Sequence, residues 1–195
     1  MVYAQLRAGY DICMTSYCDF VATKGQGTVH QHYHDHEYGF PLRDDNALFE
    51  RLMLEVNQAG LSWELILKRK PEFERAYDGF DIDTVAAYGN ADRLRLLHDA
   101  GVIRNRLKIN AAIENAKRIQ TLRGTHGSFA GWLAHQHPRD KAAWVKLFKH
   151  TFVFTGGEIV NEFLMSIGYL RGAHVESCPT FAHIAALKPA WMAGC

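Results

Sequence analysis

The sequence has few cysteines and almost no excess charge of either sign. Its 195 residues include four cysteines, which are too few for the disulfide framework of a small secreted domain. Lys and Arg together number 22 and Asp and Glu number 21, so no strong overall field attracts a polyanion or an anionic membrane. Metal ligation or free thiols are therefore the better interpretations of the cysteines, and any nucleic-acid-binding surface has to be local.

Long apolar runs are absent as well. No stretch approaches the roughly 20 apolar residues of a membrane span, and the N-terminus lacks the charged, apolar and small-residue succession of a secretory signal. We therefore expect a cytoplasmic, monomeric protein without a membrane partner. Residues 1–13 match nothing that follows. We interpret them as an N-terminal extension of unclear role that precedes one domain, residues 14–195.

Helix start and stop signals dominate from Asp44 onward. Asp44 can cap a helix whose apolar positions Leu48, Leu52 and Val56 share one face, and Gly60 can end it. The alternation of apolar and polar residues that is typical of strands does not reach a useful length. Similar signals predict helices that begin near Ser62, Pro71, Asp83, Asn90 and Ser128, and helical segments over residues 104–122, 142–148 and 159–167. The predicted fold class is mainly α.

Four residues near the two ends of the chain have the composition of a zinc site. His174 and Cys178 form an H-x-x-x-C pattern, which on a helical turn or compact loop can aim an imidazole and a thiolate at one point. Cys18 and His34 would supply the other two ligands of a closed tetrahedral Cys2His2 structural site. Such a site would tie the N-terminal segment to the C-terminal segment.

The alternative is that the two cysteines are ordinary buried thiols. His34 is also one member of an alternating histidine run that extends from His30 to His36. The run by itself therefore selects no ligand.

Two segments, residues 33–41 and 55–63, combine aromatic rings with carboxylates and amides. A base flipped out of nucleic acid is held between aromatic faces and identified through hydrogen bonds to its edges, so a pocket for it needs this combination. Glu55 would read the edge of the base. Each residue also has a purely structural interpretation, in which Trp63 is core, Tyr33 a surface ring and Glu55 an exposed helix charge.

Residues 97–109 fit a helix-hairpin-helix phosphate clamp. The turn at Gly101 and Val102 would expose backbone N–H groups beside a helix N-terminus, where partial positive charge favours a phosphate. Arg104, Arg106 and Lys108 add local positive charge. Such contacts position a protein on DNA without reading its sequence. An ordinary pair of helices that turns on a glycine is the alternative.

Five motifs in these regions follow one another in a characteristic order. They are Cys18, Tyr33-His34-Asp35-x-Glu37-x-Gly39, Glu55-x-x-Gln58-Ala59-Gly60-Leu61-Ser62-Trp63, Asp99-Ala100-Gly101-Val102-Ile103-Arg104, and His174-x-x-x-Cys178. Together they resemble the DNA-3-methyladenine glycosylase I family. The resemblance extends from about Cys18 to Cys178, and the string from Gln58 to Trp63 is its most specific piece.

The resemblance implies a helix-hairpin-helix DNA glycosylase fold that binds damaged double-stranded DNA and recognises 3-methyladenine flipped out of the duplex. It also implies a structural zinc ion held by Cys18, His34, His174 and Cys178, which joins the N-terminal and C-terminal segments.

The resemblance assigns the chemistry to four residues. Glu55 would be the catalytic residue that hydrogen-bonds the methylated base, Tyr33 and Trp63 would stack against the base, and Tyr38 would line the pocket. The implied reaction is that of a monofunctional glycosylase in base excision repair, which hydrolyses the N-glycosidic bond without a covalent lysine intermediate. An N3-alkylated adenine is positively charged and leaves readily, so no strong general base is required.

The chain departs from the family pattern at three places. Tyr38 replaces the usual tryptophan, and Leu107 stands where a glycine near the hairpin is common. Over residues 157–165, Glu158 and Glu162 stand in a segment where the family has threonines and a Y-S-F-M-Q-like helix. Added carboxylates would repel phosphate if exposed, and would change which base fits if they face the pocket. The sequence therefore leaves the lesion specificity open.

Two alternatives accompany this interpretation. One is a catalytically altered or inactive member of the same family that binds DNA lesions without hydrolysis. The other is a zinc-stabilised helical interaction module without a nucleic-acid role.

Overall fold

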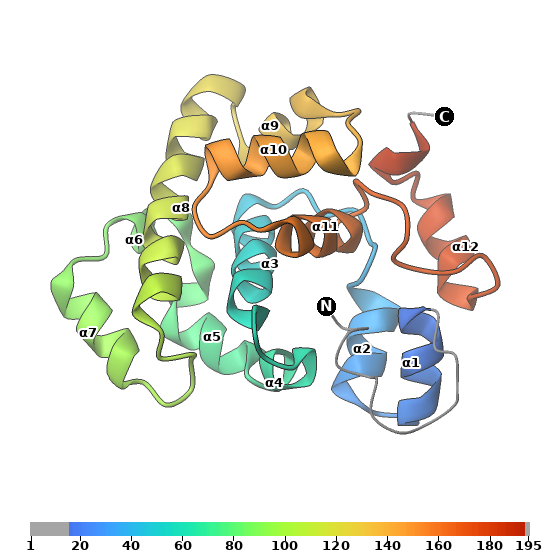
Figure 1. Ribbon diagram of the computed structural model, residues 1–195, viewed down its shortest axis with the longest axis horizontal. Helices are drawn as coiled ribbons and strands as arrows, with labels where there is room; N and C mark the ends of the chain where they lie inside the picture. The colour runs from blue at the N-terminus through green and yellow to red at the C-terminus, as the bar shows by residue number, and fades with distance from the viewer. Residues whose placement is uncertain (1–15, 194–195) are drawn as a thin grey trace.

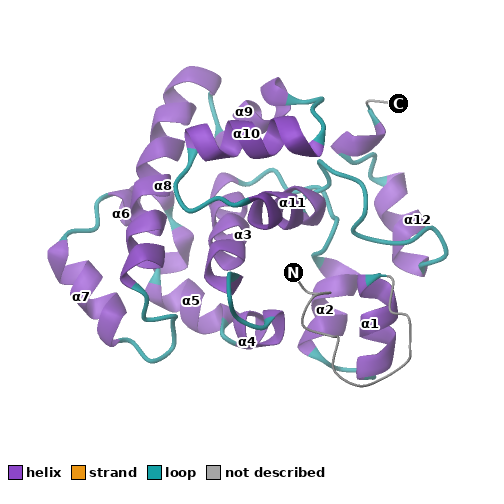
Figure 2. Cartoon of the chain, in the orientation of Figure 1, coloured by secondary structure: helices purple, strands orange, loops and turns teal. Residues whose placement is uncertain are grey.

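A computed structural model of the chain describes residues 16–193. Over these residues the chain forms helices joined by loops, without a β-strand (Figure 2), which confirms the predicted helical class. The extension predicted over residues 1–13 lies outside the described residues. No helix in the described part of the chain combines the length and apolar character needed to cross a membrane.

Twelve α-helices and two short 3-10 helices follow one another along residues 16–193. They are α1 (Tyr17–Lys24), α2 (Val29–His36), α3 (Asp45–Gln58), α4 (Trp63–Lys68), α5 (Lys70–Ala76), η2 (Asp78–Phe80), α6 (Ile82–Ala86), α7 (Asn90–His98), α8 (Arg106–His126), α9 (Phe129–Gln136), α10 (Lys141–Thr151), α11 (Gly157–Ser166), α12 (Pro179–Ala186) and η3 (Ala190–Met192).

Side-chain caps begin several helices where the sequence predicts them. Asp44 accepts a hydrogen bond from the backbone amide of Ala47 at the start of α3, and Ser62 and Ser128 cap α4 and α9 in the same way. These caps satisfy amides that have no partner within the helix. Local signals therefore suffice to place these three helix starts.

Two predicted helix starts are displaced. The cap of α6 is Asp81 rather than Asp83, since the Asp81 carboxylate accepts the amide of Thr84. The long helix α8 begins at Arg106, because Asn105 caps it through the amides of Leu107 and Lys108. It also continues beyond residue 122 to His126. In both cases the side chain that caps the helix lies within two residues of the predicted start.

Helix α3 lies at the centre of the molecule (Figure 1). It contacts α4, α6, α8, α9 and α11, and its residues from Arg51 to Gln58 are all buried. At one side of the molecule α1 and α2 lie beside α12, so that segments from the two ends of the chain are neighbours (Figure 1). The candidate sites described below lie on α3 and at this junction.

Two buried polar side chains fix the elements around α3. The Asp45 carboxylate accepts the first amides of α9, from Phe129 and Ala130, at 2.9 and 3.0 Å. Asn115 is fully buried on α8 and exchanges two hydrogen bonds with the backbone of Val153, at 2.9 and 3.1 Å. Buried amide pairs of this kind are costly to break, so the loop that leads into α11 is held in place.

Candidate functional site

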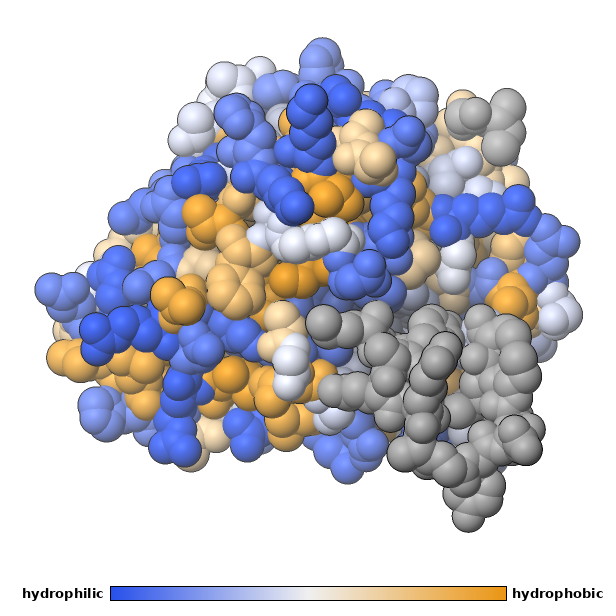
Figure 3. Space-filling model, in the orientation of Figure 1, coloured by the Kyte–Doolittle hydropathy of each residue, from blue (hydrophilic) through white to orange (hydrophobic). Residues whose placement is uncertain are grey.

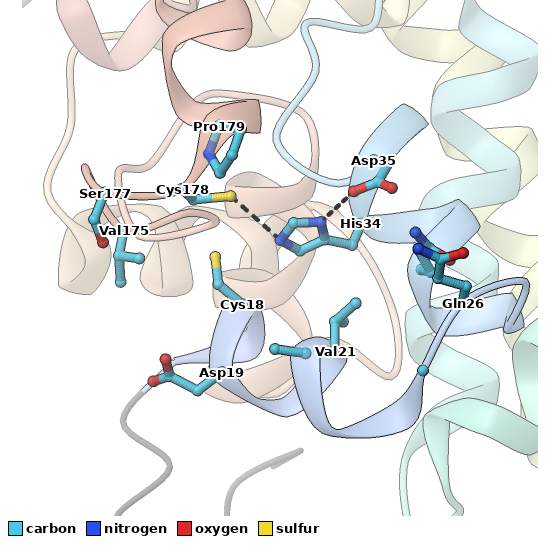
Figure 4. A pocket seen from close by; sticks show the side chains of 13 residues that line it. Cys18, Asp19, Val21, Gln26, His34, Asp35, Val175, Ser177, Cys178 and Pro179 are labelled. Atoms are coloured by element: carbon cyan, nitrogen blue, oxygen red, sulfur yellow. Dashed lines mark hydrogen bonds and ion pairs between the residues drawn. The ribbon is translucent and has the colours of Figure 1, made fainter.

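Cys18, His34, His174 and Cys178 meet in one cluster, which we call the Cys/His cluster. Their ligand atoms all lie within 4.8 Å of one another. Figure 4 shows Cys18 of α1, His34 of α2 and Cys178 converging beside a cavity of about 370 Å³. The structure therefore brings together the four residues that the sequence singled out, although they come from opposite ends of the chain.

The distances in the Cys/His cluster fit a tetrahedral metal ion. The sulfur of Cys178 lies 3.6 Å from Nε2 of His34 and 3.6 Å from Nδ1 of His174, and the sulfur of Cys18 lies 3.7 Å from the same Nδ1. Metal–ligand bonds of about 2.0–2.3 Å place tetrahedral ligands roughly 3.3–3.8 Å apart. The cluster could thus hold a metal ion with four protein ligands.

Hydrogen bonds orient both imidazoles of the cluster. Nδ1 of His34 lies 2.7 Å from the Asp35 carboxylate, and Nε2 of His174 lies 2.7 Å from the carbonyl oxygen of Tyr38. A ring that donates from one nitrogen presents a lone pair at the other, which is the arrangement of a metal-binding histidine.

Burial shifts the pKa values of two residues in the Cys/His cluster. It lowers the pKa of His174 to about 4, which keeps that imidazole neutral and able to bind a cation. Burial also raises the pKa of the Cys18 thiol to about 11. A thiolate at this position therefore needs a cation beside it, and a metal ion would provide one.

The histidine run between residues 30 and 36 is helical rather than extended. It lies on α2, where His30 and His34 are one turn apart and buried while His32 and His36 are exposed. Only His34 joins the Cys/His cluster, and Nδ1 of His30 lies 2.8 Å from the hydroxyl of Tyr17. Thr28 caps α2, and this local signal could have identified the helix in the sequence.

A second cluster forms where α2, α3 and α4 meet; we call it the aromatic cluster. It contains Tyr33, Tyr38, Glu55 and Trp63, whose exposed fractions are 2, 6, 4 and 6%. The ring centroids of Tyr33 and Trp63 are 5.2 Å apart, and those of Tyr33 and Tyr38 are 5.5 Å apart. Glu55 is buried, interacts electrostatically with Tyr33 and Tyr38, and does not point into bulk solvent.

The Glu55 carboxylate sits in a strongly desolvating environment. Within residues 16–193 no side chain or backbone amide donates a hydrogen bond to it. Burial raises the pKa of Glu55 well above its ordinary value, the nearby Glu162 raises it further, and Arg51 opposes the shift. Perturbed carboxyl groups of this kind are typical of functional sites.

Arg51 belongs to the same region and was missed in the sequence. Its guanidinium lies 5.1 Å from the ring centroid of Tyr33 and donates hydrogen bonds to the Tyr33 hydroxyl at 3.4 Å and to the Glu37 carboxylate at 3.0 Å. Arg51 precedes Glu55 by one helical turn, which places both on one face of α3. The signal available in the sequence was a pair of oppositely charged residues, four apart, on an otherwise apolar face of the predicted helix.

The ring orientations limit how a base can be held. The planes of Tyr33 and Trp63 make an angle of 71°, so both rings cannot lie parallel to one base. Arg51 and Tyr38 lie against the ring of Tyr33. The rings of Tyr33 and Trp63 therefore meet edge to face and are not stacked on one another.

Of the two added carboxylates in α11, only Glu162 reaches the aromatic cluster. The Tyr38 hydroxyl donates a hydrogen bond to Oε2 of Glu162 at 3.1 Å. Glu158 is exposed and lies 3.7 Å from Lys141. Two departures from the family pattern, 124 residues apart, are therefore joined by one hydrogen bond.

The structure contradicts the prediction that Lys108 contacts DNA. Its side chain is 5% exposed, and its ammonium donates hydrogen bonds to the carbonyl oxygens of Asn57 and Ala59 at 2.8 and 2.7 Å. These carbonyls lie at the C-terminal end of α3, where backbone acceptors lack helical partners. Lys108 thus caps α3 from a position 51 residues further along the chain.

The other predicted hairpin residues lie between α7 and α8. Arg104 and Arg106 are exposed, whereas the side chain of Val102 is buried. The Gly101 amide donates to the Asp99 carboxylate at 2.8 Å. A Cβ atom on Gly101 would lie 2.9 Å from Cβ of Glu72, so close packing requires glycine here.

The helical fold and the two clusters define a class of protein: solved structures of 3-methyladenine DNA glycosylase I share this architecture. The structure from Staphylococcus aureus, described as the basis of 3-methyladenine recognition by that enzyme, superposes with a TM-score of 0.71 at 30% identity. It matches 82% of this chain and 94% of its own.

Sequence comparison places the chain in a family. The profile of the methyladenine glycosylase family matches residues 23–144. The DNA-3-methyladenine glycosylase of Haemophilus influenzae is 31% identical, over 85% of this chain and 98% of the relative. DNA-3-methyladenine glycosylase 1 of Escherichia coli K12 is 33% identical, over 75% and 88%. The chain belongs to the DNA-3-methyladenine glycosylase I family.

The raised pKa of Glu55 predicts a pH-dependent effect of the substitution Glu55→Gln. The native state holds the Glu55 proton more tightly than the unfolded state, so wild-type stability falls as pH rises from the unfolded pKa through the folded pKa. Glutamine does not titrate. We expect Glu55→Gln to raise the free energy of unfolding at pH 8 by on the order of 1 kcal/mol, with the gain shrinking toward pH 4.

Denaturant unfolding at several pH values measures this difference. The exposed Glu114, substituted by glutamine, serves as the control and should show no such trend. A Glu55→Gln gain that is equal at pH 4 and pH 8 would show that ionisation of Glu55 is not its source.

Proposed function

We propose that the chain excises 3-methyladenine from duplex DNA by hydrolysing the N-glycosidic bond, in base excision repair. The observation that carries this proposal is the burial of the Glu55 carboxylate near Tyr33 and Tyr38 in a member of the DNA-3-methyladenine glycosylase I family. The ring of Trp63 packs on that of Tyr33. Aromatic rings and one edge-reading carboxylate are what recognition of a flipped base needs.

In this proposal each residue of the aromatic cluster has one role. Trp63 provides the face on which the base stacks, and Tyr33, held by Arg51, meets the edge of the base. The Glu55 carboxylate accepts a hydrogen bond from the exocyclic amino group. Because these side chains are nearly covered, entry of a base requires neighbouring segments to move.

The chemistry follows from the charge of the alkylated base. An N3-alkylated adenine is a cation in the nucleotide and departs as a neutral base, so the bond is already weakened before the enzyme acts. Binding energy that holds the base away from the stack, and in the orientation for departure, can therefore supply much of the acceleration. Water then attacks the sugar carbon, and no covalent intermediate with the protein is needed.

We expect Glu55→Ala and Trp63→Ala each to lower kcat/KM for release of 3-methyladenine from alkylated DNA by at least about tenfold, the effect of losing roughly 1.4 kcal/mol. Glu114→Ala, on the exposed face of α8, is the matched carboxylate control and should leave release unchanged. Release is measured by chromatography of the freed base.

A wild-type chain that binds damaged DNA tightly but frees no base would instead indicate the lesion-binding alternative. Equal affinity for damaged and undamaged duplex, together with no release, would remove both interpretations.

We further propose that the Cys/His cluster holds a structural zinc ion. Two sulfurs and two imidazole nitrogens are the donor set that zinc favours, and four protein ligands leave no open position for substrate. The ion would supply positive charge that stabilises both thiolates. It would tie α1 and α2 to the loop before α12, which supports the proposal that residues 14–195 form one domain around the core that runs from Tyr17 to Ala173.

Purified protein should carry about one zinc ion per chain, measured by atomic emission. We expect His34→Ala to lose the ion and to lower Tm, because the buried thiolates would then lack their cation. His32→Ala, two residues away on the exposed side of α2, is the matched control. Wild-type protein that contains no zinc, and whose Tm does not change when a chelator is added, would contradict the zinc site.

We also propose that α7, the loop after it and α8 act as a helix-hairpin-helix that holds the DNA backbone. The support is the exposure of Arg104 and Arg106 at the N-terminus of α8, a helix of 21 residues. The same surface exposes Leu94 and Leu107, by 55 and 66%. The face in Figure 3 mixes hydrophobic and hydrophilic residues over α7 and α8, which suits a surface that meets both phosphates and sugars.

Arg104→Ala and Arg106→Ala should each weaken binding to any duplex and reduce the slope of log K against log salt by about 0.9 if one phosphate contact is lost. Fluorescence anisotropy between low and moderate salt measures the slope. Arg139→Ala, on the loop between α9 and α10, is the control. Unchanged slopes for both variants would place the DNA elsewhere on the molecule.

A further inference from the structure

The hydrogen bond between Tyr38 and Glu162 joins the aromatic cluster to helix α11. Tyr38 follows α2, whereas Glu162 projects from α11, which packs against the Glu55-bearing helix α3. The donor–acceptor distance is 3.1 Å, and Tyr38 is almost fully buried. The bond therefore holds a second carboxylate at the cluster that contains Glu55.

The described positive charges near the aromatic cluster are paired with a carboxylate other than Glu55 and Glu162. The cations Arg51 and Lys70 are both engaged by Glu37, at 3.0 and 2.9 Å. No described cation forms an ion pair with Glu55 or Glu162 within 4.0 Å. A positively charged guest would thus be attracted by the Glu162 carboxylate, which forms no ion pair with a cation of residues 16–193.

Hydrogen bonding distinguishes the ionisation of Glu162 from that of Glu55. Burial raises the pKa of Glu162, and the hydrogen bond from Tyr38 opposes that shift by stabilising the carboxylate. Glu55 receives no such hydrogen bond from the described residues, and its pKa is raised well above the ordinary value. Of the two carboxyl groups, Glu162 is therefore the better carrier of negative charge.

The substrate carries charge only before the bond breaks. The alkylated purine is a cation while attached to the sugar and neutral after release. A carboxylate near the base thus stabilises bound substrate more than released base. Such an interaction strengthens binding of the charged lesion without accelerating bond cleavage.

We propose that Glu162, positioned by Tyr38, is a specificity-determining residue that selects cationic alkylated bases over neutral ones. This inference rests on the proposed glycosylase function and assigns to Glu162 the charge discrimination of that site. In this proposal Glu55 and the aromatic rings recognise the shape and the hydrogen-bonding edge of the base. Glu162 recognises the positive charge of the base.

The test compares two free ligands that differ in charge. The 3,9-dimethyladeninium ion keeps the positive charge of the lesion and has no bond to the sugar, whereas 3-methyladenine is its neutral counterpart. With Glu162→Gln, which keeps size and an acceptor for Tyr38, we expect the inhibition constant of the cation to rise about tenfold. The constant of the neutral base should change less than about twofold.

Excision assays on alkylated DNA provide the second readout. Glu162→Gln should raise KM by about tenfold and leave kcat within about twofold. Tyr38→Phe, which keeps the ring and frees Glu162, should give a smaller shift in the same direction. Glu158→Gln, with its exposed carboxylate on the same helix, is the control and should behave as wild type.

Equal weakening of both ligands in Glu162→Gln, or weakening of neither, overturns the inference. Such a result in a protein that still releases 3-methyladenine leaves the proposed function intact. If the wild-type chain releases no base but still binds the cation more tightly than the neutral base, and this preference depends on Glu162, the charge selection is supported. The proposed glycosylase activity is then contradicted.

Discussion

The burial of the Glu55 carboxylate against aromatic rings is the constraint on which the rest of this structure depends. A buried carboxyl group costs free energy unless its surroundings compensate it, and here α3 holds it rigidly in place. Asp44 begins α3 with a cap, and the ammonium of Lys108 closes its other end. Arg51, one turn before Glu55, supplies positive charge that opposes the rise of the Glu55 pKa.

Tyr38 links the Cys/His cluster to the aromatic cluster. The carbonyl oxygen of Tyr38 accepts a hydrogen bond from His174, while the hydroxyl of the same residue donates to Glu162. The next residue, Gly39, has a φ of +86° and would place a Cβ 2.9 Å from Cβ of Ala173. Only glycine suits that backbone and that contact. A metal ion at one cluster would therefore fix the position of a ring in the other.

Local signals in the sequence predicted the caps that begin α3, α4 and α9, and the order of the motifs brought out the residues of both clusters. Caps such as Asp44 and Ser62 act within four residues, so their effect is visible in the chain itself. Lys108 shows the opposite case, because its carbonyl partners lie about 50 residues away. The histidine run was not predicted as a helix, although Thr28 caps α2 there and His30 and His34 lie one turn apart.

The amino-acid sequence by itself determined the helical class, the ligand types of the Cys/His cluster and the family, since each depends on residue identity and short spacing. Tertiary structure alone decided that Tyr38 meets Glu162 and that Arg51 lies against Tyr33. It also decided that Glu158 stays at the surface beside Lys141. The physical reason is that electrostatic and hydrogen-bond energies depend on distances in space, and packing of α3 between α4 and α11 sets those distances.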